Sequence, residues 1–248
     1  MRKLLFFLLL LTPLQAWAII NAEDLDLVVK GEGVGGKVGF SLSGNSGNSE
    51  KVTGEASGRL LRRGGDHTTM FVASYAYGKS RGLRDTNRSF AHLRHRYALD
   101  ATWAVEAFGQ AQQNEFALLK LRTLLGGGLR WSQQKDGFSL AVGLGSFYER
   151  EELKPAANEP VTSLWRGNSY LSLYYALNER IRLQNTLYYQ PAWSDVADFR
   201  LLDEAALNIS LTDTLDLKLV IEIANDSRPP VGIKDSDISY NTGLEYRF

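Results

Sequence analysis

The side chains of this sequence best suited to metal binding or proton transfer are its three histidines, His67, His92 and His95. His92 and His95 lie three positions apart, and on a β-strand that offset points two side chains to opposite faces. One strand therefore cannot place both of them on the same metal ion. His67 follows the turn sequence at 64–66, where a solvated turn residue is the simpler interpretation. The sequence holds no cysteine, which excludes disulfides and thiol chemistry.

Two further motifs also have simple structural interpretations. The glycines at 126–128 are not followed by the Lys-Ser/Thr pair of a phosphate-binding loop, and glycines in a strand relieve crowding or let the sheet curve. The charged run at 149–152 is typical of a solvated loop rather than a cation site. We therefore predict no catalytic residue, no cofactor and no metal site, and we do not expect an enzyme.

Alternation of apolar and polar residues is the main pattern of the chain, and its last segment, Asp237–Phe248, shows it best. A period of two indicates a strand with one apolar face. The chain ends on an aromatic residue, as outer-membrane barrels do, and in such barrels the last strand pairs with the first to leave no open edge in lipid. The residues at the positions of the barrel assembly signal are Tyr240, Leu244, Tyr246 and Phe248.

The same alternation recurs along the chain in segments of about ten residues, the length of a tilted membrane-crossing strand. The predicted strands are 34–44, 50–62, 68–77, 89–99, 102–112, 119–131, 138–148, 164–176, 180–190, 199–211, 215–223 and 237–248. The predicted fold is therefore all-β, a single up-and-down antiparallel transmembrane β-barrel of about twelve strands with both termini periplasmic. A soluble β-sandwich or a secreted calyx is the alternative that would show the same alternation. The facing of 68–77 stays ambiguous.

The connections between the predicted strands differ in length by parity. Tight turns fall at Gly64-Gly65, Asp100, Lys135-Asp136, Asn178-Glu179 and Thr212-Asp213, and long loops fall near 78–88, 150–162 and 225–236. Outer-membrane barrels have short periplasmic turns and longer external loops. The parity therefore predicts that the long loops lie outside.

The N-terminus has the features of an export signal. Arg2 and Lys3 precede an apolar run at 4–11, and Ala-Trp-Ala18 follows it, as in a secretory signal peptide. We predict cleavage after Ala18, a periplasmic lead-in over 19–33 and a barrel over 34–248. Without Arg2 and Lys3 the chain carries 26 basic and 28 acidic residues, a balance that argues against a nucleic-acid partner.

These features predict export to the outer membrane of a Gram-negative bacterium. The expected partners are the lipid bilayer, its lipopolysaccharide and the machinery that assembles outer-membrane barrels.

The polar faces of the predicted strands carry more basic than acidic residues. The predicted lumen-lining residues are Lys37, Arg59, Arg94, Arg96, Glu106, Lys120, Arg122, Arg130, Arg166, Arg182, Lys218, Glu222 and Glu245. A barrel of this size is intermediate between filled eight-stranded barrels and wide porins. We predict a narrow channel that favours small anionic solutes. A lumen plugged by its own ion pairs and a scaffold that acts through its external loops stay open as alternatives.

Three stretches, taken in order, resemble one protein family. They are Gly39–Ser49, Leu124–Trp131 and Asn225–Gly232 running on to Tyr246-Arg247-Phe248. They resemble the putative salt-induced outer-membrane protein family, catalogued as a domain of unknown function, over nearly the whole mature chain. The resemblance implies an outer-membrane barrel and implies no settled activity and no catalytic residues.

Overall fold

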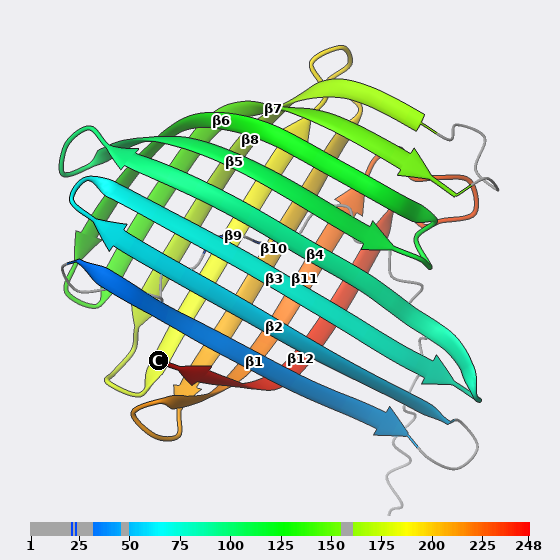
Figure 1. Cartoon of the computed structure of the whole chain (residues 1–248), viewed down its shortest axis with the longest axis horizontal. Helices are drawn as coiled ribbons and strands as arrows, with labels where there is room; N and C mark the ends of the chain where they lie inside the picture. Colours follow the sequence, from blue (N-terminus) through cyan, green and yellow to red (C-terminus); the bar gives the residue numbers. More distant parts are fainter. Residues whose placement is uncertain (1–20, 22, 24–31, 46–49, 155–160) are drawn as a thin grey trace, which may run out of the picture.

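The computed structural model describes residues 21, 23, 32–45, 50–154 and 161–248. Within these residues, twelve antiparallel strands follow one another around a closed barrel, and the last pairs with the first (Figure 1). The strands are β1 Gly33–Asn45, β2 Lys51–Gly64, β3 His67–Ser80, β4 Leu83–Ala98, β5 Trp103–Asn114, β6 Leu119–Lys135, β7 Phe138–Leu153, β8 Val161–Ala176, β9 Ile181–Pro191, β10 Phe199–Ser210, β11 Leu215–Asp226 and β12 Ser236–Arg247. The predicted all-β, up-and-down antiparallel barrel of about twelve strands is confirmed, and the periplasmic location of its termini stays a prediction. The predicted signal peptide, its cleavage after Ala18 and most of the segment 19–33 lie outside the described residues.

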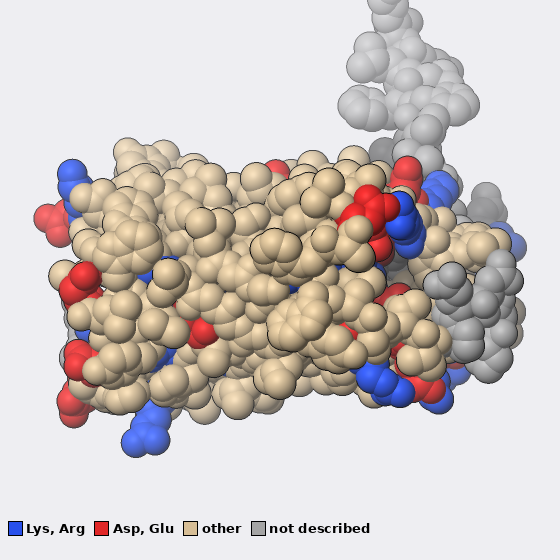
Figure 2. Space-filling view, turned by 90° about the horizontal axis from the view of Figure 1, so that it is seen from above, with Lys and Arg blue, Asp and Glu red and all other residues tan. Residues whose placement is uncertain are grey.

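The outer surface of the barrel is apolar between two charged ends. On β3, whose facing the sequence left open, Phe71 and Tyr75 are exposed outside, while Met70 and Val72 are buried inside. Charged side chains gather at the two ends in Figure 2, and a broad band of other residues separates them. This band is the belt that lipid requires of a membrane barrel. The described residues contain no helix long and apolar enough to cross a membrane.

One predicted loop is wrong. The long loop expected over 78–88 is absent, because β3 continues to Ser80 and β4 begins at Leu83. Arg81 and Gly82 form the turn between them, with φ of 49° and 76°. Two successive residues with positive φ match the right-handed twist of a two-residue hairpin. The long connection between β11 and β12 lies where it was predicted, and 155–160 fall outside the described residues.

The barrel closes along a short seam. β1 pairs with β12 only from Lys37 opposite Arg247 to Phe40 opposite Leu244, whereas β1 pairs with β2 along its whole length. Gly36 and Phe248 exchange two backbone hydrogen bonds, of 2.9 and 3.0 Å, at the end of this seam. Of the residues at the predicted assembly-signal positions, Leu244 and Tyr246 lie in the paired stretch, and Tyr240 lies beyond it.

Large inward side chains fill much of the lumen. Phe108, Leu124 and Phe147 form one buried cluster between β5, β6 and β7. Tyr170, Tyr188, Leu202 and Ala224 form a second one from β8 to β11, and Leu61, Met70, Val72 and Phe90 form a third from β2 to β4. The barrel therefore contains a core.

Candidate functional site

The lumen holds a carboxylate in a cage of arginines. Glu23, which precedes the first strand, is fully buried. Arg130 Nη1 lies 2.8 Å from its Oε2, Arg96 Nη2 lies 2.5 Å from its Oε1, and Arg94 also donates to Oε1. Arg59 donates to the backbone carbonyl of Glu23 at 3.1 Å. Arg94 and Arg96 donate to one oxygen of the carboxylate and Arg130 donates to the other, so the cage binds both oxygens of one carboxylate.

Residues from the surrounding strands hold this cage in place. Arg96 Nε donates to Glu106 Oε1 at 2.5 Å, and the hydroxyl of Tyr170 donates to Glu106 Oε2 at 2.7 Å and accepts from Arg130 at 2.9 Å. The ring of Tyr170 also lies 5.5 Å from the guanidinium of Arg94, within cation–π range. Three arginines face two carboxylates here, so the removal of Glu23 would leave a surplus of two positive charges.

His92 belongs to the packing around the cage. It is buried, and its ring stacks on Phe90 and Phe108 at centroid distances of 6.2 and 5.5 Å. Its Nε2 accepts from Arg94 at 3.3 Å, and its Nδ1 lies 3.0 Å from Gln110 Oε1. This geometry assigns a neutral ring with the proton on Nδ1, and so His92 is a structural residue.

A second ionic cluster lies nearer the barrel end that is opposite the C-terminus. Arg200 bridges Glu149, Glu151 at 3.0 Å and Asp226 at 3.0 Å. Arg122 donates to Glu151 at 2.6 Å, and Arg166 donates to Glu149 at 3.2 Å. All six of these charged groups, which come from β6 to β11, are more than nine-tenths buried, and each finds an opposite charge within the cluster.

The remaining predicted lumen residues lie in smaller groups. Arg182 pairs with Asp216 at 3.0 Å, and Lys218 pairs with Glu245 at 3.2 Å. Lys37 lies 3.9 Å from the same Glu245. These pairs join β1, β9, β11 and β12 across the inside of the wall.

One predicted lumen residue is misplaced. Lys120 is 61% exposed and pairs with Glu152 at 2.6 Å on the rim. The ladder between β6 and β7 shifts register between Leu119 and Leu121, so the alternation that places Arg122 inside does not extend to Lys120. All the other predicted lumen residues are buried or half-buried, as inward positions require.

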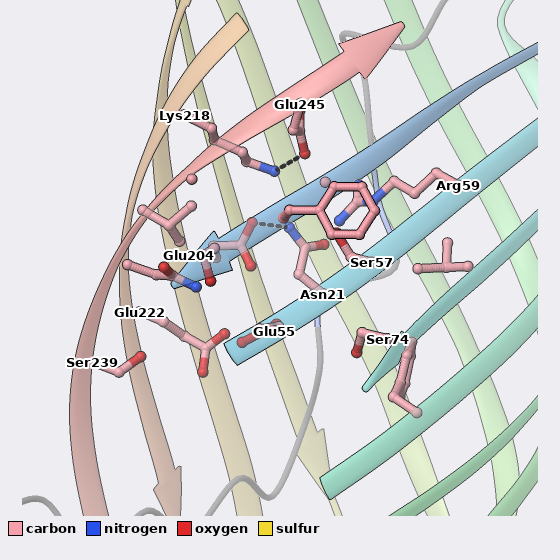
Figure 3. A pocket seen from close by; sticks show the side chains of 18 of the residues that line it. Asn21, Glu55, Ser57, Arg59, Ser74, Glu204, Lys218, Glu222, Ser239 and Glu245 are labelled. Atoms are coloured by element: carbon pink, nitrogen blue, oxygen red, sulfur yellow. Dashed lines mark hydrogen bonds and ion pairs between the residues drawn. The ribbon is translucent and has the colours of Figure 1, made fainter. Parts of the chain in front are cut away.

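A cavity of about 150 Å³ occupies the other side of the lumen. Figure 3 shows its polar lining, with Glu55, Glu204 and Glu222 directed toward its interior. Glu55 pairs with Arg88 at 2.7 Å, and Glu204 accepts from the amide of Asn21 at 3.0 Å. Glu222 stands directly opposite Glu204 on the next strand and is only 4% exposed.

The rim opposite the C-terminus is tied by exposed ion pairs. Glu115 accepts from Asn87 at 2.7 Å and pairs with Arg84 at 2.6 Å and Lys154 at 3.5 Å. The hydrogen bond from Asn87, together with the two cations, lowers the pKa of Glu115. In the next loops, backbone donation from Ala197 and the ion pair with Arg228 lower the pKa of Asp195.

The outward histidines meet near the other rim. His95 points away from the lumen, as its offset from His92 predicts, and its Nε2 lies 3.1 Å from His67 Nδ1. His67 is thus a partner of His95 rather than a lone turn residue. Among the described residues, no group of three or more His, Asp or Glu has the arrangement of a metal site.

The sequence did not identify Asn21 and Glu23, which fall in the segment expected to precede the barrel in the periplasm. Both are buried, and both contact inward side chains of the barrel. Glu23-Asp24 is an acidic pair next to an apolar stretch. Because the predicted lumen is basic, this acidic pair was the one sequence signal that could have placed Glu23 inside the barrel.

Comparisons with known proteins agree with this architecture. The sequence model of DUF481, a family of proteins of unknown function, matches residues 38–248. Among solved structures, the NanC porin superposes with a TM-score of 0.55 at 12% identity, covering 86% of this chain and 98% of that one. The translocator domain of the autotransporter NalP from Neisseria meningitidis superposes with a TM-score of 0.50 at 12% identity, covering 90% and 91%. At these identities the likeness shows the fold alone. No curated protein matches the sequence.

Proposed function

We propose that this chain, which belongs to the DUF481 family of proteins of unknown function, is a porin-like channel for small carboxylate-bearing anions. It acts in the outer membrane of a Gram-negative bacterium, reached through the predicted signal peptide. The salt-induced character of the family that it resembles stays a prediction.

The cage around Glu23 is the observation that carries the proposal. Arg94, Arg96 and Arg130 come from β4 and β6, and the carboxylate that they bind comes from a residue outside the strands. A site that binds one carboxylate by charge-assisted hydrogen bonds offers the same donors to another. Glu23 therefore identifies the ligand chemistry of the lumen.

The same contacts describe a closed state of the channel. Breaking a buried ion pair by removal of one partner costs about 3–5 kcal/mol, since the other charge is left in a medium of low polarity. A neutral solute cannot meet this cost when it displaces Glu23. An anion that brings its own carboxylate replaces the lost contacts, which is the physical basis of selectivity here.

Planar-bilayer recordings under a potassium chloride gradient test the proposal. Glu23→Gln removes the internal anion while preserving its shape, so we expect a larger conductance than in the wild type and an anion-selective reversal potential. The matched control, Glu152→Gln, changes a carboxylate on the rim and should leave the recordings unchanged. Replacing Arg94 and Arg122 by Gln should shift the reversal potential toward cations.

The recordings can also refute the proposal. A cation-selective reversal potential excludes an anion channel. No conductance from folded Glu23→Gln protein, checked by a shift in gel mobility on boiling, instead supports a permanently plugged barrel.

A further inference from the structure

The seam between β1 and β12 opens toward the barrel end opposite the C-terminus. β1 continues five residues past its last pair with β12, to Asn45, and those residues pair only with β2. Over Ser236–Gly243, β12 pairs only with β11. In Figure 1 the first half of β12 runs beside β11, and only its last part runs beside β1.

The strands part just beyond Ser41 and Gly243. A methyl group placed on Gly243 would lie 3.4 Å from Cβ of Ser41, so the two backbones are still in contact at this level. Beyond it, Leu42 and Thr242 line an opening of about 640 Å³. The lining combines outward residues, such as Tyr75, with the inward Glu55. The opening therefore lies along the gap between the two strands.

This opening and the inner cavity border the same stretch of the barrel wall. The two spaces share Phe40, Ser41, Glu55, Gly243 and Leu244 in their linings. The outer space is bordered mainly by apolar side chains, whereas the inner cavity is lined by hydroxyl, amide and carboxylate groups together with the cations of Arg59, Arg88 and Lys218. An unpaired strand edge is not stable against hydrocarbon, because its backbone groups need polar partners. A molecule with a polar head and an apolar chain fits both spaces, because its head suits the polar cavity and its chain suits the apolar opening.

The inner cavity indicates the charge of that head. Among the described residues no hydrogen bond or ion pair reaches Glu222, although it is only 4% exposed and lines the cavity. Its neighbour Glu204 has the amide of Asn21, and Arg88 is engaged by Glu55. Of the cations that line the cavity, Arg88 pairs with Glu55 and Lys218 pairs with Glu245, so the adjacent carboxylates of Glu204 and Glu222 form a site for a further positively charged group.

We propose that the seam is a lateral port and that the cavity behind it binds a single-chain amphiphile with an ammonium head. The head lies against Glu222 and Glu204. The alkyl chain leaves through the seam past Phe40 and Leu42 and enters the bilayer. This site is separate from the arginine cage and does not depend on anion passage.

Native mass spectrometry of the full chain, released from a neutral maltoside detergent, tests the head site. With dodecyltrimethylammonium as the probe, we expect one bound molecule per barrel and about a tenfold lower affinity in Glu222→Gln. Glu152→Gln is the matched control and should bind as the wild type does. Dodecanol, which lacks the charge, and tetramethylammonium, which lacks the chain, should both bind more weakly. Equal binding to wild type and Glu222→Gln overturns the head site.

A covalent bridge across the seam tests the port. The chain has no cysteine, so L42C/T242C introduces the only two thiols. Closing them by oxidation, or by a bis-maleimide if the strands rest too far apart, should abolish binding of dodecyltrimethylammonium, and reduction of the disulfide should restore it. Tight binding to the bridged barrel, or tetramethylammonium binding as tightly as the long-chain probe, overturns the port.

Discussion

The two sides of the lumen differ in how they are built. We call β4–β9 the packed side and β10–β12 together with β1–β3 the open side. The packed side points Phe108, Phe147, Tyr170 and Tyr188 inward, and all four side chains are at most 8% exposed. The open side instead lines its cavity with small residues, among them Gly39, Ser41, Ser57, Ser74 and Ser239. The size of the inward side chains therefore decides where this barrel is filled.

The shortest strand pairing of the barrel lies on the open side. β6 and β7 pair from Lys135 opposite Phe138 up to Leu119 opposite Leu153, whereas β1 and β12 share four pairs. Asn21 and Glu23 connect the two sides, since Asn21 donates to Glu204 of the open side and Glu23 binds the arginines of the packed side. Buried charge is thus matched on the packed side and left unmatched at Glu222 on the open side.

The largest expected effect is the removal of Arg200, which bridges the buried carboxylates Glu149 and Glu151 of the packed side and Asp226 of the open side. Arg200→Ala leaves Glu149, Glu151 and Asp226 without their shared partner, and we expect a loss of about 3–5 kcal/mol in the free energy of unfolding. Lys218→Ala on the open side should cost less, because Glu245 keeps Lys37 nearby. Denaturant titration of the refolded barrels in detergent measures both. Equal losses would mean that the two sides do not differ in this way.

A smaller effect is expected where the packed side brings two backbones together. A methyl group on Gly128 would lie 2.7 Å from Cα of Gly145, so Gly128→Ala must push β6 away from β7. We expect a loss of about 1–3 kcal/mol. Gly58→Ala is the control on the open side, where an added methyl meets no atom within 4 Å. The comparison fails if both substitutions are neutral in the same titration.

The link between the two sides should contribute less again. Asn21→Ala removes the hydrogen bond to Glu204 and the one that Asn21 accepts from the backbone N–H of Glu23, and we expect a loss of about 1–2 kcal/mol, the usual net value of two hydrogen bonds. Glu23→Ala should cost more, since it leaves three arginines without their carboxylate. If Asn21→Ala costs as much as Glu23→Ala, the two contacts act as one unit rather than as separate links.

Strand alternation was enough to predict the barrel, because a period of two identifies the face of each residue without any knowledge of its neighbours. It placed Arg94, Arg130 and Glu222 inside correctly. It failed at Lys120, where a register shift breaks the period. Alternation shows which side chains point inward, but it does not show whether those side chains leave an open channel or pack into a core.

Two features of the lumen lay beyond such reasoning. The pairing of Arg94 with Glu23 joins residues 71 positions apart, and periodicity holds no information on such a contact. The length of the β1–β12 seam depends on where β12 bends away from β1, which no residue of Ser236–Arg247 marks. The long loop at 78–88 was predicted wrongly because membrane-crossing length was taken as the limit of β3 and β4, and both strands continue past it.

The smallest expected effect concerns the rim above the packed side and depends on pH. The pKa of Glu115 is lowered by Asn87, Lys154 and Arg84, so the folded state holds this carboxylate ionised more strongly than the unfolded chain does. Its contribution to stability is therefore fully present above the ordinary carboxyl pKa of about 4.3 and is lost as the pH falls through the lowered value. Amide exchange over 115–118, corrected for intrinsic rates, should lose protection on acidification in that window. Glu115→Gln should remove the pH dependence; a variant that keeps it would assign the change to the ion pairs inside the lumen instead.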